Sequence, residues 1–456
     1  MGSFKIKKGL DLRLAGAPAM DISETLFPAK AAVYPSEFPG IKPRMQVKIG
    51  DLVKRGSLLF TCKKRAELRF CAPVAGKIAE INLGERRSIQ EIVIETDPKN
   101  PTVKFAKYTA AAIRDLSRDQ ILDQLLESGF LSFIRQRPFS KIAESGARPK
   151  SIFVNGMNTI PFQIDIEVVL RGKEEAFQAG LNILAHLTDG KVHLALPETA
   201  TSPALIKAEN AEVHTFTGPH PAGNSSVHIA KLDPIRQGDV VWTVDARELI
   251  LIGELFLSGE LPPQQTISFA GPGVKPKMRK HYRIIRGGWL ESAFPAGLID
   301  GEKRLLNGDI LMGDKILLQS GLRFFGSGIT VISEERKREF LGWLKPGLNV
   351  FSSSRLFLSR WLRPHAEWDL TTADHGGQRA MFATGVYDRV MPLNIMVDFL
   401  IRAVLAHDTE EAVKLGILET EPADFALCSF VCPSRTDVVG IIRQGLKEIE
   451  EEGVYE

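Results

Sequence analysis

The sequence has 456 residues, of which 44% are apolar and 25% charged, and its net charge is +3. These proportions are typical of a soluble globular protein with several domains, and they exclude a disordered or fibrous chain. So small a charge argues against nucleic acid as a partner. The most apolar stretch, residues 248–259, is interrupted by Glu254 and is shorter than the ~20 residues of a membrane-spanning helix.

Cysteine content and the start of the chain both bear on its compartment. The four cysteines (Cys62, Cys71, Cys428 and Cys432) are too few for the disulfide framework of a secreted protein. The first residues include several lysines, but the apolar run of a signal peptide does not follow them. We therefore expect a cytoplasmic protein.

Short strands are predicted between residues 40 and 97. Apolar and polar residues alternate over 46–49 and 77–81 with the period of half-buried strands, and glycines lie at the turns. The spacing of these residues resembles the biotinyl/lipoyl carrier fold, in which a lysine at a hairpin tip is acylated. Lys63 or Lys64 falls near that tip, but the surrounding sequence lacks the context that modifying ligases read. We expect an unmodified, solvated basic hairpin.

Helices and strands alternate from about residue 112 to residue 260. Strands are predicted over 152–154, 192–196, 212–216 and 240–244, and helices over 117–128, 173–188 and 246–257. This alternation favours an open, largely parallel sheet of Rossmann-like type. Glycine-rich short strands then indicate a β-grasp module, and the composition after Ser333 indicates helices.

The predicted fold class is therefore α+β with several domains. We expect an N-terminal segment packed on the Rossmann-like domain (1–39), a biotinyl/lipoyl-like barrel-sandwich domain (40–100), a Rossmann-like domain without a phosphate loop (101–262), a β-grasp or SLBB-like domain (263–332) and a C-terminal helical domain (333–456).

Seven segments spread along the chain carry a resemblance to one family. They are KIKKGLDLRLAG, RQRPFSK, GPHPAG, LFLSGEL, AGPGVKP, YDRVMPL and ALCSFVCP. With these segments the sequence resembles, from end to end, the A subunit of the sodium-translocating NADH:quinone oxidoreductases (Na+-NQR), which are six-subunit bacterial respiratory complexes. The C subunit of the Rnf complex and the flavin subunit of complex I share the implied order of Rossmann-like, β-grasp and helical domains.

The cysteine pair near the C-terminus does not complete an iron-sulfur motif. The motif C-x2-C-x2-C-x3-C-P needs four thiolates. When it is aligned with Cys428, Cys432 and Pro433, its first two positions fall on Pro422 and Phe425. Two thiolates cannot hold a cluster, so we interpret the pair as a remnant. A reversible disulfide or a two-thiolate contribution to a zinc site remain alternatives.

The residues that would bind a flavin or NAD phosphate are also missing. In the complex I relative a glycine-rich stretch after the first helix lets backbone amides approach the flavin phosphate. Bulky residues fill the equivalent stretch, 129–139, and G-x-G-x-x-G follows none of the predicted strands. We expect this subunit to bind no cofactor and no metal.

Candidate contact residues rest on residue type. His220 lies in a rigid Gly-Pro-His-Pro loop after a strand end, where open α/β sheets place ligands, and Phe216 precedes it. A quinone hydrogen bond, a subunit contact and a fixed loop are the alternatives for His220. The other candidates are Arg135, Arg137 and Phe139, which would present charge and an aromatic edge to a partner or form simple salt bridges. Tyr387 is expected to shape a subunit interface.

The resemblance implies a peripheral subunit on the cytoplasmic side of the bacterial inner membrane. The whole complex, a translocase, uses NADH, flavins, iron-sulfur and ubiquinone and pumps sodium, and this subunit is associated with the quinone-reducing end. Its partners would be the five other subunits of Na+-NQR, chiefly the integral membrane B subunit, and ubiquinone is a further candidate. The alternatives are a purely structural cap of the membrane subunits and a stand-alone NAD or flavin oxidoreductase.

Overall fold

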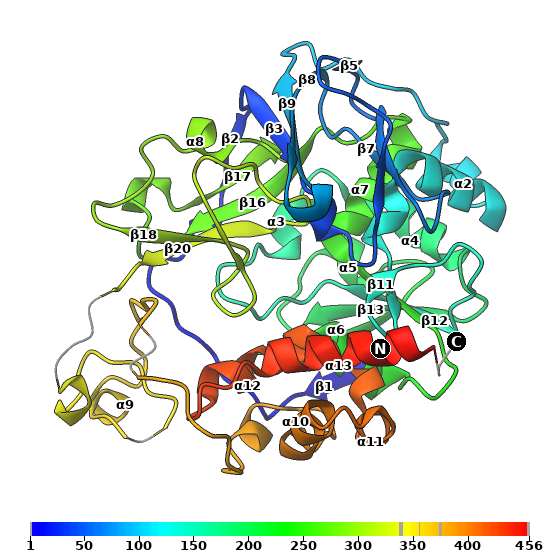
Figure 1. Ribbon diagram of the computed structural model, residues 1–456. Helices are drawn as coiled ribbons and strands as arrows, with labels where there is room; N and C mark the ends of the chain where they lie inside the picture. The colour runs from blue at the N-terminus through cyan, green and yellow to red at the C-terminus, as the bar shows by residue number, and fades with distance from the viewer. Residues whose placement is uncertain (1, 337–340, 355, 374–375, 454–456) are drawn as a thin grey trace.

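The computed structural model describes residues 2–336, 341–354, 356–373 and 376–453. Within them the chain forms four β-sheets with helices packed around the largest (Figure 1). The described part contains no helix that is both long and apolar enough to cross a membrane.

The largest sheet has seven strands in the order β1-β14-β13-β12-β15-β10-β11. The first five run parallel, and β10 and β11 are antiparallel additions at one edge. The strands are β1 (Gly2–Lys5), β10 (Arg135–Arg137), β11 (Lys141–Ile142), β12 (Ser151–Asn155), β13 (Lys191–Pro197), β14 (Glu212–Thr217) and β15 (Val241–Asp245). The four parallel strands predicted from the sequence are confirmed as β12, β13, β14 and β15.

Helices cover both faces of this sheet. In Figure 1, α4 and α7 lie on one side and α6 on the other, where the C-terminal helices join it. The helices are α1 (Ala110–Ile113), α2 (Arg118–Ser128), α3 (Ile166–Leu170), α4 (Glu174–Ala185), α5 (Pro203–Ile206), α6 (Ser225–Leu232) and α7 (Ala246–Ser258). The three predicted helices are confirmed as α2, α4 and α7.

Local sequence explains the ends of α2 and the close packing of α4 on α7. The Ser117 hydroxyl accepts from the Gln120 backbone N–H, the Gln120 side chain accepts from the Ser117 N–H, and Gly129 ends the helix in a left-handed conformation. Glycines permit the helix contact. A Cβ at Gly180 would lie 2.7 Å from Leu249, and one at Gly253 would overlap the Ala176 carbonyl oxygen.

Two small sheets form the N-terminal sandwich. One contains β3 (Lys30–Val33), β5 (Leu52–Val53), β8 (Gly76–Leu83) and β9 (Ile89–Thr96), and the other β4 (Pro43–Met45), β6 (Leu58–Cys62) and β7 (Arg69–Cys71). Phe38, Phe60 and Phe70 pack in its core, with the last two rings stacked 4.6 Å apart. Lys63 and Lys64 are exposed between β6 and β7.

A six-stranded sheet makes up the next unit, in the order β19-β18-β20-β16-β17-β2. It is built from β2 (Ile22–Leu26), β16 (Gln264–Ala270), β17 (Lys280–Ile285), β18 (Lys303–Asn307), β19 (Asp314–Ile316) and β20 (Gly328–Ser333), with α8 (Leu290–Ala293) beside it. The N-terminal segment 1–39 is therefore divided among three sheets through β1, β2 and β3. β1 and the residues that follow it contact the α/β unit, where the Ile6 and Leu10 backbone N–H groups donate to the Thr217 and His220 carbonyls, whereas β2 and β3 belong to other sheets. Strand pairing between distant segments leaves no local signal in the sequence.

The C-terminal part is less helical than the sequence analysis predicts. Between residues 333 and 396 the described residues contain one short α-helix, α9 (Ser359–Leu362), because glycine and proline recur throughout this stretch. The main helices are α10 (Val397–Leu405), α11 (Thr409–Lys414), α12 (Ala426–Val431) and α13 (Val438–Glu452). Their apolar side chains share a core with Phe216 and Val227, so these helices are packed against β14 and α6.

Candidate functional site

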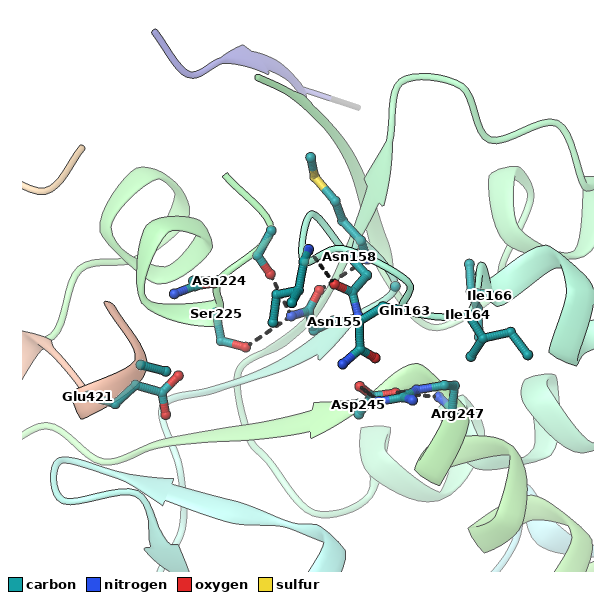
Figure 2. A pocket seen from close by; sticks show the side chains of 15 residues that line it. Asn155, Asn158, Gln163, Ile164, Ile166, Asn224, Ser225, Asp245, Arg247 and Glu421 are labelled. Atoms are coloured by element: carbon teal, nitrogen blue, oxygen red, sulfur yellow. Dashed lines mark hydrogen bonds and ion pairs between the residues drawn. The ribbon is translucent and has the colours of Figure 1, made fainter. Parts of the chain in front are cut away.

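A crevice opens where β12 and β15 end. From β12 the chain proceeds to β13 and β14 on one side, whereas β15 lies on the other, so the strand order reverses between β12 and β15. Open α/β sheets bind ligands outside the carboxyl ends of the strands at this position. Asn155 and Asp245 end the two strands and are paired in register. Both line a crevice of about 200 Å³ (Figure 2).

One wall of the crevice is an ion pair at the start of α7. The Asp245 carboxylate accepts a hydrogen bond of 2.9 Å from the Arg247 backbone N–H and caps the helix. The Arg247 guanidinium donates two more bonds, of 2.8 and 2.7 Å, to the same carboxylate. The helix N-terminus and the arginine charge are both neutralised by Asp245, so this wall does not present a free anion site.

Asn155 and Gln163 present carboxamides at the centre. The Asn155 Nδ2 donates to the Gly223 carbonyl at 2.8 Å, and Oδ1 accepts from the Met157 N–H at 3.0 Å, so this side chain is fixed. Gln163 lies near Asn155 and the Asp245–Arg247 pair in Figure 2. Its Oε1 is buried and has no hydrogen-bond partner among the described residues. Gln163 is therefore a polar group of the crevice that could serve a ligand.

The opposite wall comes from the C-terminal part of the chain. Glu421, which lines the crevice, pairs with the buried Arg137 at 2.7 Å and accepts from the Ser140 hydroxyl at 3.1 Å. Behind it, Asp424 accepts from the Asn224 Nδ2 at 2.9 Å. Burial, together with the charge of Glu421, raises the pKa of Asp424 to about 6. The C-terminal segment thus completes the site.

The crevice combines amide groups with apolar side chains and lacks a phosphate cradle. Ile160, Ile164 and Ile166 supply apolar surface. The turn after β12 contains a single glycine, Gly156, and its position is crowded by Leu196, 2.8 Å from where a Cβ would be. With Arg247 paired and Glu421 on the rim, the arrangement suits a neutral group that carries carbonyl or hydroxyl oxygens on an apolar body.

Two of the predicted contact residues lie behind this crevice. His220 is 3% exposed, and its Nδ1 lies 3.0 Å from the Thr159 Oγ1, with which it shares a hydrogen bond. Burial lowers the pKa of His220 to about 4, so the imidazole is neutral near pH 7. Phe216 is 1% exposed and its ring packs on those of Phe4 and His228. His220 therefore supports the turn that bears Gln163, and neither residue lines the crevice.

The other predicted residues are dispersed. Arg135 stacks over the Phe325 ring at 4.6 Å, where the α/β unit meets the six-stranded sheet. Phe139 lines a separate cavity of about 840 Å³ between the sheet edge and α13. The Tyr387 hydroxyl lies 3.0 Å from the Cys432 Sγ, and both side chains are buried. Only Arg137, through Glu421, is joined to the crevice.

Sequence reasoning did not find the crevice residues. Part of the crevice could have been found from the sequence, because Asn155 and Asp245 come at the ends of buried strands of a parallel sheet. Glu421 had no such signal, since only tertiary packing brings it to the strand ends.

Comparison with known families matches two parts of the chain. Residues 4–97 match the family described as the NqrA N-terminal barrel-sandwich hybrid domain, and residues 116–261 match the NqrA second alpha/beta domain. The first match begins within the N-terminal segment, in agreement with the position of β3 in the sandwich.

Curated proteins match along the whole length. An A subunit of the Na(+)-translocating NADH-quinone reductase from Yersinia pestis is 39% identical over 453 residues, which cover 99% of this chain and 100% of that protein. The A subunits of the same name from Pasteurella multocida and Vibrio parahaemolyticus are 39% and 38% identical, and each match covers 98% of this chain and 99% of the relative. A solved NAD+-reducing [NiFe]-hydrogenase matches 77% of this chain and 66% of its own at 12% identity with a TM-score of 0.37, a level from which nothing further follows.

Proposed function

The chain belongs to the family of A subunits of the Na(+)-translocating NADH-quinone reductase, and on that premise we propose that it is a peripheral subunit of such a sodium-pumping complex. It would lie on the cytoplasmic side of the bacterial inner membrane and act at the quinone-reducing end. The observation that carries the proposal is the match to these A subunits along almost the entire chain. Its partners would be the five other subunits, chiefly the integral membrane B subunit.

Within this proposal the domains have the fold types that the sequence analysis predicts. The seven-stranded sheet with α4 and α7 corresponds to the Rossmann-like domain, because β14, β13, β12 and β15 have the 3-2-1-4 order of that fold. The six-stranded sheet corresponds to the β-grasp or SLBB-like domain. The boundaries near residues 40, 101, 263 and 333 remain proposals.

Assembly is tested by co-expression. The chain should sediment with membranes when the integral subunits are present and remain in the supernatant when they are not. Sedimentation with protein-free vesicles of bacterial lipid would contradict a location that depends on partners.

We propose that neither a flavin nor an iron-sulfur cluster binds to this chain. Phe130 and Phe133, in the stretch that aligns with a flavin loop, are buried, and the Phe133 ring stacks on Phe324 at 5.6 Å. Cys428 is fully buried, and Phe425 occupies a ligand position of the cluster motif. The purified chain, expressed with iron and riboflavin, should show no flavin or iron-sulfur absorbance. A stoichiometric spectrum of either kind would overturn the proposal.

The crevice is the place where this chain would meet a quinone head. Its volume is below the roughly 300–1,000 Å³ of pockets for drug-sized ligands, so it suits a ring and not an isoprenoid tail. The Gln163 Nε2 can donate to a quinone carbonyl, its unpartnered Oε1 can accept from a quinol hydroxyl, and Ile160 and Ile164 offer the apolar surface that a ring needs. A purely structural cap is the alternative.

The test compares Gln163→Leu with the exposed control Gln319→Leu in the assembled complex. Loss of one hydrogen bond, worth about 0.5 to 1.5 kcal/mol, should raise the half-saturating ubiquinone concentration about twofold to tenfold. NADH oxidation with an artificial acceptor should be unchanged. Equal half-saturation in both variants would favour the structural cap.

A further inference from the structure

Three potential metal ligands meet at the opposite end of the sheet from the crevice. His193 lies near the amino end of β13, and Glu212 and His214 lie at the start of β14. His193 pairs in register with Glu212, and His214 follows two residues later, so all three side chains lie on one face of the sheet. None of the three was a candidate in the sequence analysis, which expected no metal.

The two imidazoles share a hydrogen bond, and the distances among the three ligand atoms also suit a small cation. His193 Nδ1 and His214 Nε2 are 3.2 Å apart, and Glu212 Oε2 lies 3.8 Å from the first and 3.9 Å from the second. Two nitrogens bound to Zn²⁺ at tetrahedral angles are about 3.3 Å apart, since each Zn–N bond is about 2.0–2.1 Å. The histidine spacing already fits, and Glu212 must move by about half an ångström to complete the site.

Neighbouring side chains orient these three groups, and the exposed Glu212 makes the site accessible from solvent. Phe153 packs on the His193 ring at 4.9 Å and fixes it, and His193 is 5% exposed. Glu212 is at the surface and its Oε1 accepts from Lys191 Nζ at 2.5 Å, which leaves Oε2 for the ion.

We propose that His193, Glu212 and His214 bind a late first-row divalent cation, with Zn²⁺ as the natural probe. Imidazole ligands select such a cation over Mg²⁺ or Ca²⁺, which prefer oxygen. Water would take the fourth position. Because Zn²⁺ is redox-inert, the site would clamp β13 to β14 and would add no electron carrier to the chain.

Two features of the site should limit its affinity for the metal ion. Metal binding at His214 Nε2 places the imidazole hydrogen on Nδ1, and that buried atom has no hydrogen-bond partner among the described residues. Lys191 adds a positive charge beside the carboxylate. With three protein ligands and these two costs, we expect a dissociation constant in the micromolar range and not the tighter values of a four-ligand structural site.

The experiment is a Zn²⁺ titration of the tag-free, chelator-treated full chain against a chromophoric competitor. One equivalent should bind, and Glu212→Gln and His214→Gln should each weaken binding at least about tenfold. Lys191→Gln should strengthen it severalfold. The matched control is His407→Gln, which disrupts an exposed histidine–glutamate pair of 3.0 Å, and it should leave binding unchanged.

Two further measurements keep the proposal open to contradiction. Zn²⁺ should raise the melting temperature of the wild-type chain and of His407→Gln but not of His214→Gln, provided all three melt alike without metal. Cys432→Ser is titrated in parallel because thiolates also bind zinc, and it should retain the equivalent. Absence of binding, loss of the equivalent in Cys432→Ser, or equal affinity in His214→Gln and wild type would overturn the site.

Discussion

Arg137 on β10 is joined to Glu421 in the C-terminal part by an ion pair of 2.7 Å. The arginine is 1% exposed, and its Nε and Nη1 have no partner among the described residues. The charge of a guanidinium taken out of water is therefore balanced chiefly by one carboxylate. This pair connects the helical part to the sheet and closes the crevice wall.

Removing the carboxylate should cost more than removing the arginine. Glu421→Gln leaves a buried guanidinium without its main partner, for which about 3–5 kcal/mol is typical. Nearby Asp424 should keep the loss near the lower figure. Arg137→Met leaves a glutamate that water can reach, and should cost less. Urea unfolding of both variants measures the difference.

The exposed pair Arg148–Asp189, at 2.9 Å, provides the control for this comparison. Asp189→Asn should change the free energy of unfolding by less than about 1 kcal/mol, because exposed pairs contribute little. If Arg137→Met proved as costly as Glu421→Gln, the asymmetry in burial would not be the cause.

Gly253 should be required for the packing of α7 on α4. A methyl group there would overlap the Ala176 carbonyl oxygen, which belongs to a helix backbone and cannot move aside cheaply. Although alanine favours helices, we expect Gly253→Ala to lower the free energy of unfolding by about 1 to 3 kcal/mol. Gly146→Ala, at a position with open space, is the control and should be nearly neutral in the same denaturation experiment.

The stability of the fold should depend on the protonation of Glu248. Burial, followed by the charge of Asp245, raises the pKa of Glu248 to about 7. The folded state then binds more protons than the unfolded state between the two pKa values. The associated stability is complete below about pH 4 and is lost as the pH rises through 7.

Glu248→Gln tests this sign. The wild type should lose more unfolding free energy than the variant between pH 5 and pH 8, by about 1 to 3 kcal/mol. Glu127→Gln, at an exposed position of α2, should show the wild-type dependence. A parallel pH dependence in Glu248→Gln and wild type would contradict the raised pKa.

Elements specified by local sequence could be predicted, whereas long-range pairing could not. Ser117, Gln120 and Gly129 mark both ends of α2 by rules that act within a few residues. In contrast, β1 pairs with β14 and β2 pairs with β17. In the sequence, the sandwich and much of the α/β unit lie between the two strands of each pair. The sequence of a four- or five-residue strand does not indicate which strand it pairs with.

The same division applies to the candidate sites. Asn155 and Asp245 follow from the rule on strand ends, but Glu421 enters the crevice only through its contact with Arg137. For His193, Glu212 and His214, the E-x-H spacing places two ligands on one strand face, but their proximity to His193 depends on strand register. His220 is the opposite case. Its residue type and its rigid Gly-Pro-His-Pro loop suggested a ligand contact, but in the structure the side chain is buried.

The position of His220 leads to a prediction that separates direct quinone contact from support of the turn. The residue shares one hydrogen bond with Thr159, whose hydroxyl also accepts from the Gly223 N–H at 3.1 Å, and Gly223 lines the crevice. If His220 acts by holding the turn, Thr159→Val should have at least the effect of His220→Ala, because it removes the same hydrogen bond and also the one from the Gly223 N–H. Each should raise the half-saturating ubiquinone concentration of the assembled complex about twofold to tenfold. NADH oxidation with an artificial acceptor should be spared, and subunit content must be equal in each preparation. An effect of His220→Ala without one of Thr159→Val would show that the imidazole itself meets the quinone, which would require the Gly-Pro-His-Pro loop to open in the complex.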